Sequence, residues 1–407
     1  MESPRLIAAL TRIVRDVGLA EDLAQDALEA ALRQWPTSGI PDNPAAWLMG
    51  TAKHRAIDAM RRQATLQRKT AELGHTLQRD EADARDLATA IGDESIDDDV
   101  LRLVFICCHP VLSVDSRVTL TLRLLGGLRT DEIARAFLVP DTTIGQRIGR
   151  AKRTLSEAHV PFEVPLGADL DARLASVLQV VYLVFNEGYS ATAGDDWVRP
   201  ALCEDALRLG RILAILVPDQ PEVHGLVALM EIQSSRMRAR TDHAGKPIPL
   251  LEQQRASWDQ LLIHRGLAAL DVAKSFAGAR GPYVLQAEIA ACHARARTAD
   301  ETDWPRIVAL YDALAQLTPS PIVELNRAVA VGMAFGPEAG LELVDALAHD
   351  PSLKSYHLVP AVRGDFLMKL QRHDEAAAEL ARAASMTRNL PERNLLLERA
   401  RAAGEAS

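Results

Sequence analysis

Aromatic side chains are scarce in this chain: Phe, Trp and Tyr together make up 4% of its 407 residues. Strands of β-sheets favour aromatic and β-branched residues, so this composition is poorly suited to an all-β fold. Alanine, leucine, arginine and glutamate are abundant instead, and these residues favour helices. We therefore expect an all-α fold, divided into about two to four domains for a chain of this length.

Cysteine is also rare, with four residues in the whole chain. Cys107, Cys108, Cys203 and Cys292 form no C-x-x-C pair, so the sequence suggests neither a disulfide framework nor a zinc site. The run Cys107-Cys108-His109 offers metal-ligating side chains, but adjacent cysteines fit poorly into one tetrahedral site. We interpret the cysteines as small buried hydrophobic residues and expect no metal and no cofactor.

Long apolar runs are missing as well. A membrane-spanning helix needs about 18 or more apolar residues in a row, and the closest candidate, 174–185, is interrupted by Ser176 and Gln179. The N-terminal sequence MESPRLIAALTRIVRD carries charges where a signal peptide has an uninterrupted apolar segment. We expect a cytoplasmic protein that does not associate with membranes.

Acidic residues outnumber basic ones, and the resulting net charge of −9 argues against a protein that simply coats nucleic acid. The distribution is uneven, however. Residues 52–69 contain six Lys or Arg and a single acid, Asp58, while residues 142–155 contain four basic residues and no acid. Between them, residues 72–99 contain ten acids and two arginines. Two basic segments therefore flank an acidic segment, and local basic patches of this kind bind phosphate groups.

Nearly every periodic segment of the chain has helical spacing. Residues 19–35 carry an apolar stripe, a loop with Pro and Gly covers 36–44, and a helix is predicted over about 45–62. Prolines and a glycine mark a second junction at 160–167. The C-terminal part predicts six helices with short breaks, at 304–317, 321–334, 337–348, 354–370, 374–386 and 391–403. Their similar lengths suggest tetratricopeptide-like (TPR-like) repeats, with an irregular helical bundle as the alternative.

Residues 128–155, LRTDEIARAFLVPDTTIGQRIGRAKRTL, have the pattern of a helix-turn-helix. Thr130 is positioned to cap a short first helix, Leu138-Val139-Pro140 to form the turn, and Asp141 to cap the second helix. The predicted buried face of the second helix comprises Ile144, Ile148, Ala151 and Leu155. The residues expected to face DNA are Thr142, Thr143, Gln146, Arg147 and Arg150. The second helix of such a motif enters the major groove, where Arg can read guanine and Gln adenine. We predict DNA binding; the alternative is an ordinary helical hairpin with a solvated basic face.

The helix at 45–62, AAWLMGTAKHRAIDAMRR, has an aromatic residue on its polar side. On a helical wheel the core side comprises Met49, Ala52, Ala56, Ala59 and Met60. Trp47 lies among the polar and basic residues instead. Single-stranded bases stack on aromatic side chains beside basic groups, and each stack contributes about 1–3 kcal/mol. Two interpretations stay open, since Trp47 can also pack beneath the preceding loop.

These motifs follow one another in an order that one family shares. AEDLAQDALEAALRQW (20–35), the Pro/Gly loop, the Trp-led basic helix, the acidic linker and the helix-turn-helix resemble a bacterial RNA polymerase sigma factor of the extracytoplasmic-function (ECF) type, within the sigma-70 family. The resemblance covers residues 1–160. The continuation resembles a subgroup with a long, TPR-like C-terminal extension. Three segments look like parts of that extension: VYLVFNEGYSA (181–191), GPYVLQAEIAACHA (281–294) and DWPRIVALYDAL (303–314).

The resemblance implies two partners: core RNA polymerase, through its β′ clamp helices and β flap, and promoter DNA. The helix at 20–35 is expected to dock on the clamp helices, and the loop at 36–43 to capture a flipped base of the −10 element. The residues implied in polymerase binding are Asp22, Leu23, Gln25, Asp26 and Leu28. The residues implied in −10 recognition and opening are Asn43, Trp47, Lys53, Arg55, Arg61 and Arg62.

The implied organisation has five segments. They are a region 2 domain (1–71), an acidic linker (72–98), a region 4 helix-turn-helix domain for the −35 element (99–160), a helical extension (161–300) and TPR-like repeats (301–407). The implied function is promoter-specific transcription initiation with a melted −10 element. We expect the extension to regulate or support this activity in cis, and to offer a site for a protein partner or a ligand.

The stretch VYLVFNEGYSA places an apolar helix before a polar cluster. Its expected buried stripe consists of Leu174, Val177, Val180, Val181 and Val184. Gly188 is expected to end this helix. The polar cluster of Asn186, Glu187 and Tyr189 is interpreted as a regulatory contact that fixes how this segment packs against the sigma domains or the repeats.

Three other interpretations stay open. A helix-turn-helix regulator with a TPR-like sensor domain explains residues 100–160 and the C-terminal part, but gives the first 70 residues no role. An enzyme in the C-terminal region would need catalytic partners for Glu187 or Tyr189. The histidines there are scattered without a catalytic or metal-binding spacing, at His224, His243, His264 and His293. A pure interaction scaffold fits only residues 300–407. We therefore predict no enzyme and no catalytic residue.

Overall fold

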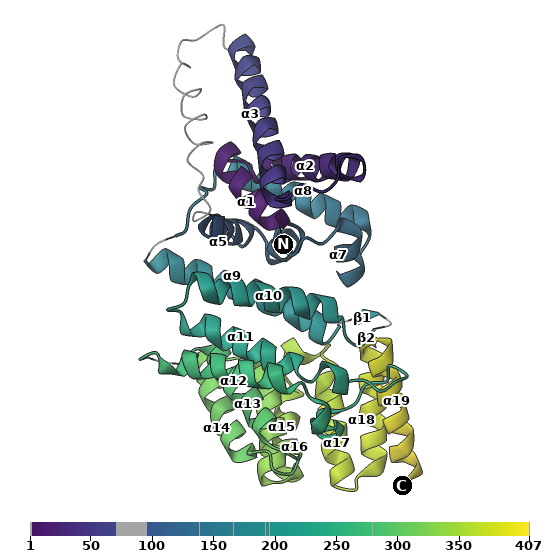
Figure 1. The fold of residues 1–407 in the computed structure, drawn as a ribbon. Helices are drawn as coiled ribbons and strands as arrows, with labels where there is room; N and C mark the ends of the chain where they lie inside the picture. The colour runs from purple at the N-terminus through teal and green to yellow at the C-terminus, as the bar shows by residue number, and fades with distance from the viewer. Residues whose placement is uncertain are drawn as a thin grey trace. The chain divides into compact units, whose positions relative to one another are not determined.

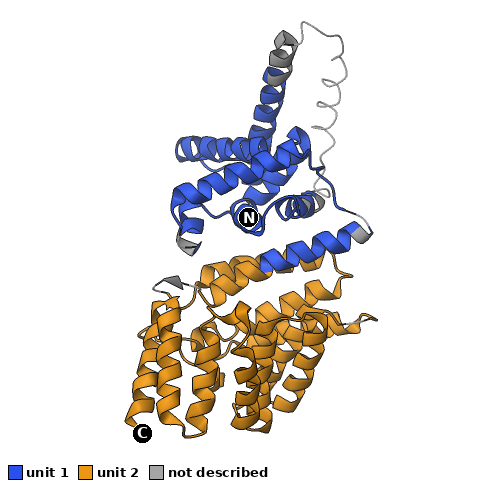
Figure 2. Cartoon of the chain, turned by 180° about the vertical axis from the view of Figure 1, so that it is seen from behind, with its two compact units in different colours: residues 1–181 blue, residues 182–407 orange. Residues whose placement is uncertain are grey.

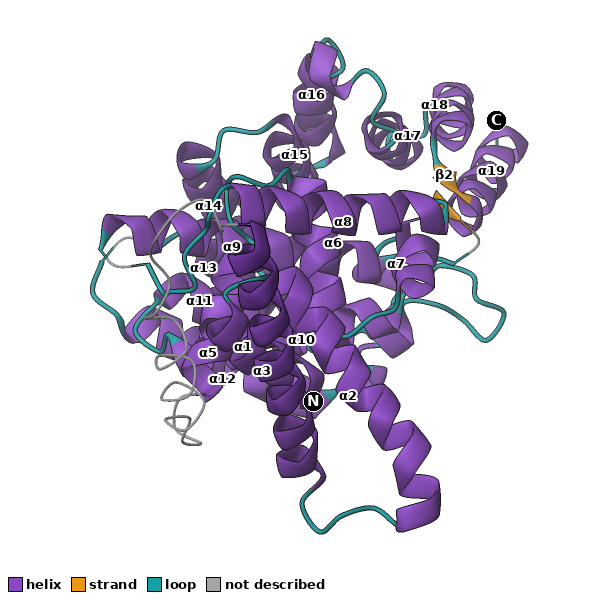
Figure 3. Cartoon of the chain, turned by 90° about the horizontal axis from the view of Figure 1, so that it is seen from above, coloured by secondary structure: helices purple, strands orange, loops and turns teal. Residues whose placement is uncertain are grey.

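A computed structural model describes residues 2–70, 96–137, 139–165, 167–191, 193–194, 196–278 and 280–406. These residues fold almost entirely as helices, and each of the two strands is two residues long (Figure 3). The all-α prediction is confirmed. The chain divides into two compact units, Met1–Val181 and Tyr182–Ser407, which Figure 2 colours separately. Among the described helices, none combines the length and apolar character that crossing a membrane requires.

Unit 1 contains the helices that the sequence assigns to the polymerase-binding and DNA-binding parts. Most of the predicted acidic linker, residues 72–95, lies outside the described residues. The described helices (Figure 1) are α1 (Glu2–Val14), α2 (Val17–Ser38), α3 (Pro44–Thr70), α5 (Ile96–Cys107), α6 (Val114–Leu124), α7 (Thr130–Phe137), α8 (Asp141–Glu157) and the first part of α9 (Ala168–Tyr189).

Helices α1, α2 and α3 pack against one another through small and aliphatic side chains. Leu10, Ala20, Ala27, Ala52 and Ala56 are completely buried at these contacts. Side chains of this size let two helices approach closely, so the completely buried contacts of the three helices are made by small and aliphatic residues.

The loop predicted at 36–44 is shorter than expected, because α2 continues through Pro36 to Ser38. A proline near the end of a helix removes only one backbone donor, and the surrounding groups compensate for it. The hydroxyls of Thr37 and Ser38 both donate to the carbonyl oxygen of Gln34, at 2.9 Å. The N–H of Gly39 donates to the carbonyl of Trp35, and Gly39 then turns the chain with a positive φ of 80°. The loop is therefore confined to residues 39–43.

The first part of α9 is bound to α5 and α6 by polar contacts. Ser176 donates to the carbonyl oxygen of Cys108 at 2.8 Å and accepts from Arg117 at 2.6 Å. Arg173 donates to the carbonyl oxygen of Phe105 at 3.0 Å. Cys108 is buried, and burial raises the pKa of its thiol to about 11, as expected for a cysteine that serves as a core residue. Residues 168–181, which were predicted as part of the extension, thus lie within compact unit 1.

The second part of α9 begins unit 2, and the helix ends one residue later than predicted. The apolar stripe from Leu174 through Val184 is buried as predicted, but the helix runs on to Tyr189. Gly188 is an internal position where α9 meets the start of α10, not a helix terminator. A Cβ at Gly188 would lie 2.7 Å from the backbone nitrogen of Cys203 and 2.9 Å from its sulfur.

Unit 2 consists of helices that pack largely against their neighbours in the sequence. Many begin with proline in the first turn, where its fixed φ suits a helix and its missing N–H costs nothing. After α9, its elements are β1 (Ala193–Gly194), α10 (Pro200–Leu216), α11 (Pro221–Ser234), η2 (Met237–Ala239), η3 (Leu250–Glu252), η4 (Arg255–Ser257), α12 (Gln260–Ser275), α13 (Pro282–Arg295), α14 (Trp304–Leu317), α15 (Pro321–Phe335), α16 (Pro337–Leu347), η5 (Pro351–Leu353), α17 (Leu358–Lys369), α18 (His373–Met386), β2 (Arg388–Asn389) and α19 (Leu390–Glu405).

The six C-terminal helices predicted from the sequence correspond to α14–α19, with ends that differ by a few residues. Each of them packs on the next in the order of the chain, as in a helical repeat array. The two short strands join distant parts of unit 2, because β1 pairs in parallel with β2, Ala193 opposite Arg388. Asn389 reinforces this junction by donating to the carbonyl oxygens of Ala191 and Asp196, at 3.1 and 2.8 Å.

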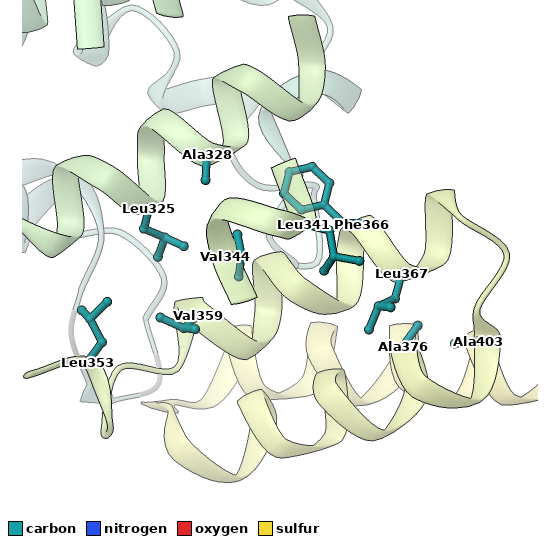
Figure 4. Close-up of a cluster of buried hydrophobic side chains, with 10 residues drawn as sticks. All are labelled: Leu325, Ala328, Leu341, Val344, Leu353, Val359, Phe366, Leu367, Ala376 and Ala403. Atoms are coloured by element: carbon teal, nitrogen blue, oxygen red, sulfur yellow. The ribbon is translucent and has the colours of Figure 1, made fainter. Parts of the chain in front are cut away.

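A hydrophobic cluster from α15 to α19 forms the core of the C-terminal helices (Figure 4). Its largest side chain, Phe366, reaches α15 and α16 at two glycines, Gly332 and Gly340. A Cβ at Gly332 would lie 2.3 Å from Cε1 of Phe366, and one at Gly340 would lie 2.5 Å from its Cζ. Both glycines are therefore required by the close approach of the phenyl ring.

Replacing Gly332 with alanine should lower the free energy of unfolding by about 1–3 kcal/mol, because the added methyl group overpacks the cluster. Gly404→Ala is the matched control: it is also helical, and a Cβ there meets nothing within 4 Å. The control should be neutral or stabilise by up to about 1 kcal/mol, the difference in helix propensity. Thermal and urea unfolding followed by circular dichroism measure both. Equal stability of the two variants would contradict this account of the cluster.

Candidate nucleic-acid interface

Helices α7 and α8 form the predicted helix-turn-helix. The first helix buries Ile133 and Ala134, and Val139 and Pro140 lie in the turn. The buried face of α8 consists of the four predicted residues, Ile144, Ile148, Ala151 and Leu155. Helix α8 packs on α6 and α7 and also contacts α2 through Lys152, so only its exposed residues are available to a partner.

The predicted caps of both helices are wrong in detail. Thr130 is the first residue of α7, and the start of the helix is stabilised by Glu132, whose carboxylate accepts from the N–H of Arg129 at 2.7 Å. Asp141 is the first residue of α8 and makes no capping hydrogen bond; Pro140 occupies the cap position. The negative charge of Asp141 still lies in the first turn, where the helix dipole favours it.

The face of α8 that was predicted to contact DNA is largely open. Thr142, Gln146 and Arg150 are exposed, and Thr143 and Arg147 are half-buried. Arg147 lies 3.3 Å from the carboxylate of Asp115, with 31% of its side chain exposed. To contact a base, Arg147 must therefore leave the Asp115 carboxylate, whereas Arg150 has no such contact to break among the described residues.

Glu21 of α2 is a buried carboxylate that joins three helices, and sequence reasoning missed it. Its side chain is 4% exposed, yet Arg123 of α6 and Lys152 of α8 both approach it within 2.6 Å. Gln25 adds a hydrogen bond of 2.9 Å. A buried carboxylate needs such partners, since an unpaired buried charge is costly. In the sequence Glu21 is one acid among several in a polar helix, and nothing marks it as buried.

Helix α3 places Trp47 against another tryptophan. The ring centroids of Trp47 and Trp35 are 5.5 Å apart in an edge-to-face arrangement, and both side chains are half-buried. Of the two interpretations of Trp47, packing thus has a specific partner in Trp35 at the end of α2, while the half-exposed ring still leaves area for stacking. On the core side of α3, Ala52 and Ala56 are buried as predicted, and Leu48 is buried although it was not predicted.

The other residues predicted for the −10 element lie along α3 and at its start. Asn43 is exposed, and its side chain caps α3 by accepting from the N–H of Ala46 at 3.0 Å. Lys53 is half-buried, and its pKa is lowered by burial and by the nearby charge of Arg12. Arg55 lies 3.4 Å from Asp26 of α2 and Arg61 lies 3.9 Å from Asp58; Arg62 is exposed.

The polymerase-binding residues predicted on α2 divide into two groups. Asp22, Gln25 and Asp26 are exposed and Leu28 is half-buried, so these four can be reached by a partner. Leu23 is 6% exposed and contributes to the core of unit 1. Leu23 was predicted to dock on the polymerase, but in this structure its side chain packs into the core.

The polar cluster predicted in α9 lies inside unit 2. Glu187 is 9% exposed and forms an ion pair with Arg199. The ring of Tyr189 stacks on Phe185 with 5.8 Å between centroids, and the guanidinium carbon of Arg240 lies 3.7 Å from the centroid of the Tyr189 ring. Asn186 lies at the wall of a cavity with Tyr189. Sequence reasoning did not find the arginines of this region, because 233–240 carries no motif.

Two segments of the chain match sigma-70 families. Residues 1–65 match sigma-70 region 2, which includes α2 and most of α3, and residues 102–155 match sigma-70 region 4, which includes most of the helix-turn-helix described above. Residues 173–274 match a family of unknown function, DUF6596. The fold and the two matched regions thus define a protein of the sigma-70 class with additional helical sequence.

Similarity to curated proteins indicates which type of sigma-70 protein this chain is. The chain is 43% identical to the uncharacterized protein R00370 of Rhizobium meliloti over 390 residues, 96% of this chain and 91% of the relative. It is 29% identical to the ECF RNA polymerase sigma factor SigK of Mycobacterium ulcerans over 37% of this chain and 78% of SigK. It is 26% identical to the ECF RNA polymerase sigma factor SigX of Bacillus subtilis over 32% of this chain and 66% of SigX. No solved structure matches the chain. The chain belongs to the ECF type of the sigma-70 family, in a form with a C-terminal helical extension.

Arg150→Ala should relax sequence preference at one base pair, at a cost of about 1–3 kcal/mol, because a lost bidentate contact to guanine removes discrimination at that position. Selection of duplexes from a randomised library by the chain bound to core RNA polymerase measures the preference. Arg401→Ala, an exposed arginine on α19, is the matched control and should leave it unchanged. If the Arg150→Ala protein keeps the full sequence preference of the parent, Arg150 does not contact a base.

Proposed function

We propose that this chain binds core RNA polymerase and directs initiation at promoters with two elements. In this proposal, α8 reads the −35 element in the major groove of duplex DNA, and α3 with the loop before it captures and opens the −10 element. The accessible face of α2, with exposed Asp22, Gln25 and Asp26 and half-buried Leu28, docks on the β′ clamp helices, and the β flap is a second polymerase contact.

One observation carries this proposal: a single chain holds two differently built basic surfaces. Helix α8 offers exposed Thr142, Gln146 and Arg150 on a rigid helix of a helix-turn-helix, which suits duplex reading. Helix α3 offers the half-exposed ring of Trp47 and basic residues, which suit single-stranded bases. A regulator that binds duplex DNA alone would have no use for the second surface.

The net charge of −9 supports a model in which the polymerase supplies most of the affinity for DNA. Affinity for nonspecific DNA comes from neutralised phosphates, and an acidic chain with two small basic surfaces has little of it. Promoter binding should therefore depend on the polymerase, which supplies most of the phosphate contacts. The chain then contributes sequence preference rather than bulk affinity.

We further propose that the C-terminal extension regulates or supports initiation in cis. Helix α9 supports this proposal, because its first part is hydrogen-bonded to the region 4 helices α5 and α6, while its last part lines the interior of unit 2. A change of state within unit 2 that shifts or reorients α9 would therefore reach the DNA-reading domain through a continuous helix.

Trp47→Ala should reduce formation of the open complex by about 1–3 kcal/mol, the contribution of one stacked base, while polymerase binding stays unchanged. Run-off transcription and permanganate reactivity measure opening, and fluorescence anisotropy measures binding to core polymerase. Trp35→Ala is the matched variant, because it removes the packing partner of Trp47 but not Trp47 itself. Parallel losses of stability, polymerase binding and opening in both variants would show that Trp47 acts through folding alone.

A chain that ends after Ser190 should change run-off transcription about fivefold or more relative to the full chain, the size of an ordinary coupling between sites. The cut keeps α9, because residues 168–181 are part of unit 1. Retained binding to the selected −35 duplex and a retained thermal transition control for folding. A folded, truncated chain with unchanged transcription would refute regulation in cis.

A further inference from the structure

Unit 2 contains a partly open cavity of about 260 Å³ between its helices, lined by residues of α9, α11, α13, α14 and α15. Three of the five tyrosines of the chain line it, Tyr182, Tyr189 and Tyr311. Arg236 and His293 line it as well, and among the described lining residues there is no aspartate or glutamate. Although the chain has few aromatic residues, several of them line this cavity together with Arg236.

Arg236 is the unusual residue of this cavity. It is 7% exposed, and no carboxylate forms an ion pair with it among the described residues. Its guanidinium donates to the amide oxygen of Gln233, and its Nε has no acceptor. Burial and the nearby charge of Arg240 both oppose its ionisation, and burial lowers its pKa. A buried cation without an anion is costly, and folds normally pair it.

Other arginines of unit 2 show the usual arrangement. Arg199 pairs with Glu187, Arg211 lies 2.7 Å from Glu231, and Arg363 lies 2.7 Å from Asp345. These three arginines have carboxylate partners, whereas Arg236, which lines the cavity, has none among the described residues.

Three neighbouring groups are also buried without hydrogen-bond partners. They are the hydroxyl of Tyr189, Nδ1 of His293 and Nε of Arg240. Arg240 is 8% exposed and lies over the ring of Tyr189, 3.7 Å from its centroid. Burial and the charges of Arg236 and Arg255 lower the pKa of His293 to about 3, so its ring is neutral at pH 7 and can donate or accept one hydrogen bond on each side. Unpaired buried polar groups are rare in folded proteins and require an explanation.

We propose that this cavity is a binding site for a small organic anion, with a carboxylate or phosphate group held by Arg236 and Tyr189 and an aromatic or planar body held among the tyrosines. Arginine recognises both groups through paired N–H donors, and such charge-assisted bonds are the strong ones. The tyrosine rings offer apolar faces for a planar body. The volume limits the ligand to the size of a metabolite rather than a peptide. The site stands whether or not the chain directs transcription.

The test is equilibrium binding to the purified full chain by calorimetry, with thermal shift as a second readout. The probes are benzoate, phenyl phosphate, inorganic phosphate and neutral benzamide, each up to about 10 mM, where a Kd of 1 mM is still detected. We expect saturable binding of benzoate or phenyl phosphate, and whichever binds more tightly identifies the head group. Binding of neither, binding of benzamide with equal affinity, or binding of inorganic phosphate as tight as phenyl phosphate would overturn the proposal.

Arg236→Gln should weaken the bound probe about 10- to 100-fold, the contribution of hydrogen bonds from a charged group. It should not lower the melting temperature of the free chain, because it removes an unpaired buried cation. Arg238→Gln is the matched control, an exposed arginine two residues away in the same turn, and should bind as the parent does. Tyr189→Phe, which removes one unpartnered hydroxyl, should also weaken binding and keeps the test valid if Arg236→Gln does not fold. Unchanged affinity in a folded Arg236→Gln or Tyr189→Phe protein would overturn the proposed site.

Discussion

The close approach of helices at small side chains is the constraint on which this fold depends. With few aromatic residues, the chain brings helices together through alanine and glycine, and several glycines leave no room for a methyl group. A Cβ at Gly225 would lie 2.7 Å from the backbone nitrogen of Val284, and one at Gly266 would lie 2.6 Å from Ile232. Backbones in such contact fix one another's position, so the helices can carry exposed functional side chains at defined places. The rare aromatic residues are then available for particular tasks, such as the pair of Trp35 and Trp47.

Much of the fold could be predicted because helical periodicity is a local property. The buried face of α8 and the stripe of α9 follow from the spacing of their apolar residues. Helix ends were predicted less well, because they depend on contacts from elsewhere. Pro36 does not end α2, since nearby hydroxyls and Gly39 satisfy the carbonyls of its last turn. Gly188 does not end α9, since its small size serves contact with Cys203.

The candidate site could be predicted only as far as exposed residues on a single helix. The residues of α8 that are predicted to face DNA were chosen from its periodicity, and three of them, Thr142, Gln146 and Arg150, are exposed. Leu23 was assigned to a surface although it is buried, because a stripe that faces a core and a stripe that faces a partner look the same in sequence. Glu21 and Arg236 were missed because their roles arise from pairing across the fold: one buried charge has two cationic partners, and the other has no carboxylate partner among the described residues. The absence of a partner cannot be read from a sequence at all.

The central claim is that one chain addresses two promoter elements in two different ways. Footprinting of the full chain with core RNA polymerase on a selected promoter fragment tests it most directly. The account predicts protection of two separate segments, with permanganate-reactive, unpaired thymines only in the segment nearer the start site. Protection of the upstream segment alone, with fully paired DNA throughout and no need for the polymerase, would contradict it and identify a regulator that binds duplex DNA.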